Sequence, residues 1–119
     1  MSVNVLKEAK GALEGLDADR IVNVYAHEFL FEDTSSKERI TDRIALRGYF
    51  QQLFALPQVS FSDIRIFEAE SFAAIEWIWS GVKRETGKPY RVKGASVIEL
   101  REGKISRETI YYDPGPALS

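Results

Sequence analysis

The chain has 119 residues, which is the usual length of one domain, and we expect a single domain over residues 1–119. Hydrophobic residues make up 45% and charged residues 29% of the sequence, a composition typical of globular proteins and not of disordered ones. Because 16 Lys and Arg residues are balanced by 18 Asp and Glu residues, the sequence lacks the basic excess that nucleic-acid partners or an anionic membrane surface require.

The scarcity of cysteine and histidine limits the chemistry further. The sequence has no cysteine and one histidine, His27. This excludes disulfides, thiolate nucleophiles and cysteine-based metal sites, and one histidine cannot form a multi-histidine centre, so we expect no metal. Because the N-terminal residues show no apolar run long enough for a signal peptide and no segment is long enough to span a bilayer, we expect a cytoplasmic protein.

The first half of the chain shows helical periodicity at three points. A first predicted helix ends near Gly15 and has on one face Leu6, Ala9, Leu13 and Leu16. A second, short helix is predicted to start from Asp17 as its N-cap and to bury Ala18, Ile21, Val22 and Tyr25. A third, longer helix is predicted between an N-cap at Thr41 and Pro57, with an apolar stripe of Leu46, Phe50, Leu53 and Phe54.

A short strand is predicted between the second and third helices, over residues 28–33. Phe29, Phe31 and Asp33 then point to one face, and Glu28, Leu30 and Glu32 to the other. Residues 34–37 predict a turn or loop. Glu32 and Asp33 are adjacent on the strand and point to opposite faces, so they cannot form a paired-carboxylate site.

From Val59 onward the periodicity changes to two, which indicates four long strands near 59–68, 72–84, 89–101 and 105–112. Their connections are so short that consecutive strands must pair antiparallel. Helices followed by an antiparallel meander predict an α+β domain in which the helices cover one face of the sheet.

Alternation along the strands predicts which side chains face the helices. The helix-covered rows are Ala73, Ile75, Trp77, Trp79 and Gly81 on one strand and Tyr90, Val92, Gly94, Ser96, Ile98 and Leu100 on the next. The opposite face is more apolar than a solvated face needs, with Phe72, Ile78, Val82 and Val97 among its charges. We therefore expect a homodimer that packs through this outer sheet face.

The last strand does not show which of its two faces points inward. Ile110 and Tyr112 alternate with Thr109 and Tyr111, and either set could face the helices. If the even-numbered set points inward, Glu108 enters the interior as well and becomes a further carboxylate candidate.

Several short motifs occur in an order that resembles a known family. They are Leu16-Asp17-Ala18-Asp19, Phe31-Glu32-Asp33, Glu76-Trp77, Gly103-Lys104-Ile105 and Tyr111-Tyr112-Asp113. The chain resembles, from about Leu6 to Asp113, the SnoaL-like and ketosteroid isomerase-like branch of the nuclear transport factor two-like superfamily. The resemblance implies a cone-shaped fold in which a strongly bent sheet wraps three helices around a deep apolar pocket. It also implies frequent dimers and, for the cyclases of the family, chemistry without metal or cofactor.

Two aspartates are the catalytic candidates. Asp33 matches the position at which ketosteroid isomerase-like enzymes keep a proton-shuttling carboxylate, although an Asp before Thr-Ser-Ser is also what a strand-ending turn uses. Asp113 matches, by its distance from Gly103-Lys104, the acid/base Asp of the cyclases, although it too can end a strand in a turn. The Trp usual on that last strand is absent, with Thr109 near its place.

The same resemblance argues against ordinary steroid isomerisation. That reaction needs hydrogen-bond donors for a dienolate oxygen, supplied by a Tyr and a protonated acid. This sequence has Ala9 and Ser96 at those positions. The Asp-Arg-Asp arrangement of the epoxide hydrolases is also missing, since the nearest pattern is Arg91-Val92-Lys93, and one histidine cannot supply the pair that the dehydratases use.

The aromatic side chains of the inner face suggest a ligand site. Trp77 and Trp79 share one face and could stack a planar ligand, although aromatic rows at strand spacing are more often plain core. The predicted ligand-binding residues are Tyr25, Phe31, Phe50, Trp77, Trp79, Ser96, Ile98 and Tyr112.

Three hypotheses follow. The leading one is a pocket protein that binds or transforms a small hydrophobic cyclic molecule, polyketide- or steroid-like, by cofactor-free proton transfer through Asp33 or Asp113. The second is a non-catalytic ligand-binding member of the same fold. The third is a dimerisation module whose core is filled.

Overall fold

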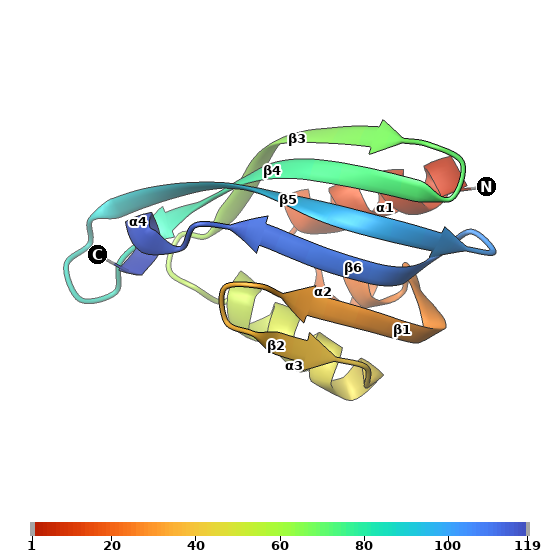
Figure 1. Cartoon of the computed structure of the whole chain (residues 1–119). Coiled ribbons are helices and arrows are strands. Elements are labelled where there is room, and N and C mark those ends of the chain that lie inside the picture. Colours follow the sequence, from red (N-terminus) through yellow and green to blue (C-terminus); the bar gives the residue numbers. More distant parts are fainter. Residues whose placement is uncertain (1, 119) are drawn as a thin grey trace.

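A computed structural model describes residues 2–118, so the two predicted domain limits, residues 1 and 119, lie outside the described residues. It consists of one strongly bent sheet with three helices on its concave side (Figure 1). The α+β class, with helices covering one face of the sheet, is confirmed.

The elements follow one another in an order close to the predicted one. The helices are α1 (Ser2–Glu14), α2 (Ala18–Val22), α3 (Arg43–Phe54) and α4 (Gly115–Leu118). The strands are β1 (Tyr25–Asp33), β2 (Glu38–Ile40), β3 (Ser60–Glu68), β4 (Phe72–Val82), β5 (Pro89–Arg101) and β6 (Lys104–Tyr112). The four long strands of the second half lie within two residues of their predicted bounds.

The sheet order is β2-β1-β6-β5-β4-β3, and its neighbours are antiparallel except for β1 and β6, which pair in parallel. The predicted meander of β3 to β6 is confirmed. The sequence did not show that β1 lies beside β6, because this pairing joins segments more than seventy residues apart. Its consequence is that side chains of the first strand and of the last strand meet in one interior.

Four local predictions were wrong or incomplete. Tyr25 does not belong to the second helix, which ends at Val22, but begins β1. The third helix is capped by Asp42 instead of Thr41, because the Asp42 carboxylate accepts the N–H of Ala45 at 2.9 Å. The short strand β2 and the terminal helix α4 were not predicted; both are only a single turn or a few residues long, which is too short for a periodic signal.

The predicted faces of the sheet are correct. On β1, Phe29, Phe31 and Asp33 are buried, whereas Glu28 is exposed. On β6 the even-numbered set points inward, so Glu108 and Ile110 are buried while Tyr111 is 52% exposed. The ambiguity of the last strand is thereby resolved, and a carboxylate enters the interior of the molecule.

Trp77 lies across the backbone of the neighbouring strand. Its register partner on β5 is Gly94, and a Cβ atom there would lie only 2.3 Å from Cη2 of the indole. The indole can therefore lie flat against β5, where its Nε1 donates to the hydroxyl of Ser96 at 3.1 Å. A glycine at residue 94 is thus a condition for the position of Trp77.

We predict that Gly94→Ala lowers the free energy of unfolding by about 1–3 kcal/mol, because the added methyl group displaces a packed indole. Gly48→Ala is the matched control: it lies inside α3 with nothing within 4 Å of the added Cβ, and should raise stability by about 0.5–1 kcal/mol. Urea unfolding followed by tryptophan fluorescence measures both. Equal effects of the two substitutions would contradict this account of Trp77.

Candidate functional site

The bent sheet and the helices enclose a partly open, largely apolar cavity of about 80 Å³. Its walls come from α1, α2, α3 and from strands β1, β3, β4, β5 and β6. The residues that line it are Ala9, Leu13, Ile21, Tyr25, Phe31, Tyr49, Phe50, Leu53, Phe61, Ile75, Trp77, Trp79, Ser96, Ile98, Ile105, Glu108, Ile110 and Tyr112. Eight of these 18 side chains are aromatic.

All the side chains that the sequence predicts as ligand contacts lie in this wall: Tyr25, Phe31, Phe50, Trp77, Trp79, Ser96, Ile98 and Tyr112. Ala9, which stands where the family's isomerases have a Tyr, contributes only a methyl group to the wall. The two predicted catalytic aspartates are not in the wall.

Glu108 is the carboxylate that reaches the cavity. Only 8% of its surface is exposed, and its Oε1 accepts a hydrogen bond from the hydroxyl of Tyr25 on β1. Ser96 on β5 also hydrogen-bonds to Glu108, and the Ser96 oxygen in turn accepts the indole N–H of Trp77. A chain of four side chains from four strands therefore ends on one buried carboxyl group.

Burial controls the ionisation of this group. Desolvation raises the pKa of Glu108 above its ordinary value, and the hydrogen bonds from Tyr25 and Ser96 offset part of that rise. The pKa of Tyr25 is also raised, first by burial and then by the negative charge of Glu108. Among residues 2–118, no Lys, Arg or His forms an ion pair with Glu108. A raised carboxyl pKa in an apolar cavity is the property expected of a general acid or base.

Asp33 lies behind the wall and is fully hydrogen-bonded. Its Oδ2 accepts the hydroxyls of Tyr49 at 2.8 Å and Tyr112 at 2.9 Å. Its Oδ1 accepts the backbone N–H groups of Ser35 at 3.0 Å and Ser36 at 3.1 Å, which form the turn after β1. With 3% of its surface exposed, Asp33 both closes the turn and fixes two tyrosines of the cavity wall.

The two tyrosines respond to this contact. The pKa of Tyr49 and that of Tyr112 are both raised far above the ordinary value, mainly by burial and further by the Asp33 carboxylate. Both phenols therefore keep their protons and donate them to Asp33, because a carboxylate can only accept.

Every hydroxyl proton of the cavity wall is consequently already donated to a carboxylate. Tyr25 and Ser96 donate to Glu108, while Tyr49 and Tyr112 donate to Asp33. The indole N–H of Trp77 is bound to Ser96. That of Trp79 has no hydrogen-bond partner, but the nitrogen is fully buried and does not reach the cavity surface. For the described residues, the surface of the cavity therefore offers a ligand hydrogen-bond acceptors, and its one unpaired side-chain donor, the indole N–H of Trp79, is buried behind that surface.

Asp113 lies apart from this group. It is exposed, it follows the end of β6, and its Oδ1 accepts the N–H of Gly115 at 2.9 Å. This is the contact of a turn-forming Asp. The structure thus places the two predicted aspartates in different surroundings, with Asp33 against the cavity wall and Asp113 on the surface.

The sequence-based prediction did not include Tyr49. It included Glu108 only if the even-numbered residues of the last strand face inward. Tyr49 lies three residues after Leu46 and four before Leu53, so helical spacing alone could have placed it on the inner face. Glu108 could not be placed, because β6 carries apolar side chains on both faces and its sequence does not show which face turns inward. Only the pairing of β6 with β1 and β5 determines this.

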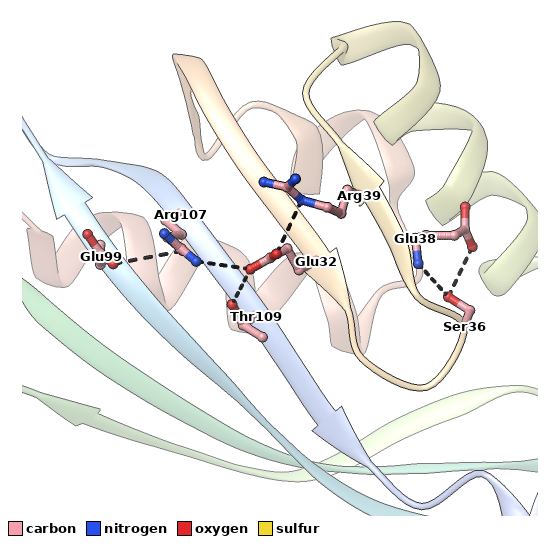
Figure 2. Close-up of polar contacts among 7 residues, drawn as sticks. All are labelled: Glu32, Ser36, Glu38, Arg39, Glu99, Arg107 and Thr109. Atoms are coloured by element: carbon pink, nitrogen blue, oxygen red, sulfur yellow. Dashed lines mark hydrogen bonds and ion pairs between the residues drawn. The ribbon is translucent and has the colours of Figure 1, made fainter.

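The outer face of the same strands carries a separate charged network, shown in Figure 2. Glu32 accepts hydrogen bonds from Arg107 at 3.2 Å and Thr109 at 3.1 Å and pairs with Arg39 at 3.3 Å. Glu32 and its neighbour Asp33 therefore point to opposite faces, as the sequence indicates. These outer charges take no part in the cavity.

Residues 2–118 form neither a cluster of metal-ligating side chains nor a membrane-spanning helix. No group of three or more His, Asp or Glu side chains there is arranged to hold a metal ion. None of the helices in that part of the chain has the length and hydropathy needed to cross a membrane.

The raised pKa of Glu108 predicts a pH-dependent stability. Below about pH 4.3 the residue is protonated in both the folded and the unfolded chain. As the pH rises, the unfolded chain loses this proton first, so the free energy of unfolding falls until the folded-state pKa is passed. Glu108→Gln cannot lose a proton, so its free energy of unfolding does not fall in this way. Its stability relative to wild type should therefore increase as the pH rises from about 4.3 to the folded-state pKa of Glu108.

Chemical denaturation between pH 4 and pH 8 measures this difference. The control is Glu28→Gln, which changes an exposed glutamate on the outer side of β1. A constant stability difference between Glu108→Gln and wild type at all pH values would show that Glu108 is not held in its neutral form by burial.

Comparison with known proteins places the chain in a family. The sequence profile described as the SnoaL-like domain matches residues 8–108. No curated protein matches the chain significantly.

Solved structures share the fold. A candidate isomerase from Bacillus subtilis is 26% identical, with 95% of this chain and 86% of that chain covered at a TM-score of 0.75. A candidate polyketide cyclase from Xanthomonas campestris is 19% identical, with 96% and 91% covered at a TM-score of 0.81.

A third structure, from Catenulispora acidiphila, is that of a hypothetical protein with a ketosteroid isomerase-like fold in complex with trimethylamine. It is 18% identical, with 96% and 88% covered at a TM-score of 0.84. The match over 8–108, together with this bent sheet around a cavity, shows that the chain belongs to the SnoaL-like domain family.

Proposed function

We propose that the protein binds a small, largely apolar molecule in the cavity and transfers a proton to or from it through the carboxyl group of Glu108, without a cofactor. The observation that carries this proposal is a buried carboxyl with a raised pKa at an apolar wall, hydrogen-bonded by Tyr25. Such a group is neutral over part of the range in which other carboxyls are ionised, and so can both accept and return a proton.

The volume of the cavity limits the size of the ligand that it can hold. A cavity of about 150 Å³ is known to hold benzene, and this one measures about 80 Å³. A steroid or a fused polyketide would need side chains of the wall to move. The cavity as it stands favours a small molecule, in keeping with the complex that the C. acidiphila protein forms with trimethylamine.

The two predicted catalytic aspartates receive other roles in this proposal. Asp33 is a positioning residue, because its oxygens are occupied by two backbone N–H groups and by the hydroxyls of Tyr49 and Tyr112. Asp113 takes no role, because it is exposed and bound to the turn that follows β6.

The alternative function is binding without catalysis. No accessible side-chain donor is free in the cavity among the described residues, since the unpaired indole N–H of Trp79 is buried. This favours binding without catalysis for neutral carbonyl ligands, because an oxyanion formed there would initially meet only acceptors. Catalysis on such a ligand requires that Glu108, once protonated, releases the hydroxyl of Tyr25 to donate to the oxyanion. Proton transfer and simple binding are therefore separated by experiment.

Hydrogen–deuterium exchange at carbon tests the proton transfer. Acetone, cyclobutanone and protonated 1-pyrroline are incubated with the protein in D₂O, and the loss of their α-proton signals is followed by ¹H NMR. We expect exchange of at least one of them to exceed the buffer rate and to fall by about 10²-fold or more in Glu108→Gln. Glu28→Gln should retain the wild-type rate.

The outcomes separate the two functions. Exchange at the buffer rate for all three molecules, or equal rates for wild type and Glu108→Gln, would overturn proton transfer by Glu108. Binding without exchange would then leave the non-catalytic function.

We also propose that two copies of the chain pack through the outer sheet face. Exposed apolar side chains gather there, with Phe67 46%, Phe72 56%, Val97 49% and Tyr111 52% exposed. Phe67 and Val97 lie in one row across the sheet, on either side of Ala74. Charges of both signs flank this patch, including the pair of Arg107 with Glu32 in Figure 2, so a two-fold axis can match opposite charges. Of the other predicted interface residues, Ile78 is buried and Val82 half-buried.

Val97→Lys is predicted to weaken self-association by about tenfold or more, because it places a charge at the centre of the patch. The control is Ile44→Lys, where an apolar side chain is 82% exposed but belongs to helix α3 and not to the outer sheet face. Sedimentation equilibrium measures both. A wild-type chain that stays monomeric at 100 µM, or dimers that Val97→Lys leaves intact, would contradict the proposed interface.

A further inference from the structure

When Glu108 is ionised, the cavity holds a negative charge that has no positive partner among the described residues. Glu108 is buried, and the groups that hydrogen-bond to it, Tyr25 and Ser96, are neutral hydroxyls. None of the described Lys, Arg or His side chains lines the cavity. Arg43 of α3, whose guanidinium reaches the backbone of Tyr25, is occupied by the carbonyls of Val22, Tyr25 and Ala26. An ionised carboxylate buried without a counter-ion is costly, so this position favours a cation that comes from outside the chain.

The hydrogen-bonding groups of the wall also favour a cationic ligand. All four hydroxyls of the wall donate their protons to Glu108 or Asp33, and their remaining lone pairs can only accept. A ligand with carbonyl or carboxylate oxygens would meet acceptors only. A ligand with N–H groups or a diffuse positive charge would meet complementary groups.

Aromatic rings supply the third observation. They line the cavity from five elements: β1, α3, β3, β4 and β6. Neighbouring rings pack closely; Phe31 and Phe50 have centroids 5.8 Å apart, and Trp77 and Tyr112 6.0 Å apart. Rings grouped in this way around a desolvated space attract organic cations through their negative faces.

We propose that the ligand of this cavity is a small organic cation, a protonated alkylamine or an iminium ion, with its charge against Glu108 and its alkyl groups among the aromatic rings. This inference deepens the proposed function and rests on it in so far as it uses the same cavity and the same carboxyl group. It goes beyond it by naming the chemical class of the ligand.

A cationic ligand also removes a difficulty of the proton-transfer chemistry. When a base takes a proton from the carbon next to an iminium group, the C–H electron pair forms the new C=C bond, and the C=N π pair becomes the lone pair of a neutral enamine nitrogen. The proton ends on the Glu108 carboxylate, so both charges disappear together. No oxyanion forms, so the lack of an accessible free donor among the described residues of the wall is then no obstacle.

Direct binding measurements on two molecules of the same shape test the proposal. Isopropylammonium and 2-propanol differ in the charged group, and both are small enough for a cavity of about 80 Å³. Their dissociation constants are measured at pH 8 by ligand-observed NMR titration. We expect isopropylammonium to bind the wild-type chain at least about tenfold more tightly than 2-propanol. In Glu108→Gln this preference should disappear, whereas Glu28→Gln should keep it.

A second measurement does not depend on a variant. In the wild-type chain, the affinity for isopropylammonium should fall as the pH is lowered through the pKa of Glu108, while the ligand itself stays protonated. The other titratable groups that face Glu108 are Tyr25 of β1 and Tyr49 of α3, and their pKa values are raised out of this range. Asp33 lies behind Tyr49 and Tyr112, so Asp33→Asn serves to show whether its charge contributes.

The results have separate meanings for the two proposals. Equal affinities of isopropylammonium and 2-propanol, or a preference that survives Glu108→Gln, would overturn the cation proposal and would leave proton transfer by Glu108 standing. A preference for the cation without any exchange at carbon would support this proposal and remove the catalytic one. An affinity for isopropylammonium that does not change between pH 8 and pH 4 would contradict the assigned ion pair.

Discussion

The burial of the Glu108 carboxyl group in an apolar cavity is the constraint on which the functional part of the structure depends. The bent sheet leaves a space that the helices do not fill, and β6 directs this side chain into it. Tyr25 and Ser96 hold the group by hydrogen bonds but bring no positive charge. The pKa of Glu108 is therefore set by burial against two neutral donors, and the proton transfer and the cation binding that we propose both use this imbalance.

The second buried carboxylate, Asp33, has more hydrogen-bond partners than Glu108. Asp33 receives four hydrogen bonds, two from backbone N–H groups and two from Tyr49 and Tyr112. The two carboxylates thus differ in their surroundings: Asp33 holds the turn after β1 and two tyrosines of the wall, while Glu108 lies in the cavity wall with two hydrogen bonds. This division also explains why the hydroxyls of the wall present oxygens and not protons to the cavity.

Most of the fold and most of the cavity wall could be predicted from the sequence, because both depend on local periodicity. Alternation along β4 and β5 placed Trp77, Ser96 and Ile98 on the inner face, and the structure has them there. The prediction failed where the decisive contact is distant in sequence. The parallel pairing of β1 with β6 brings Tyr25 beside Glu108 across 83 residues, and no local pattern encodes it. A resemblance to the family directed attention to the two aspartates, but their partners decide what a carboxylate does.

Carboxyl-carbon NMR of the wild-type chain, with the Glu108 signal assigned by comparison with Glu108→Gln, tests the central claim most directly. Titration of this signal needs no ligand and no assumption about the reaction. The account predicts a midpoint clearly above the ordinary glutamate value of about 4.3, since burial outweighs the hydrogen bonds of Tyr25 and Ser96. A midpoint at or below that value would mean that water or a cation already neutralises the cost of burial, and the account would be wrong.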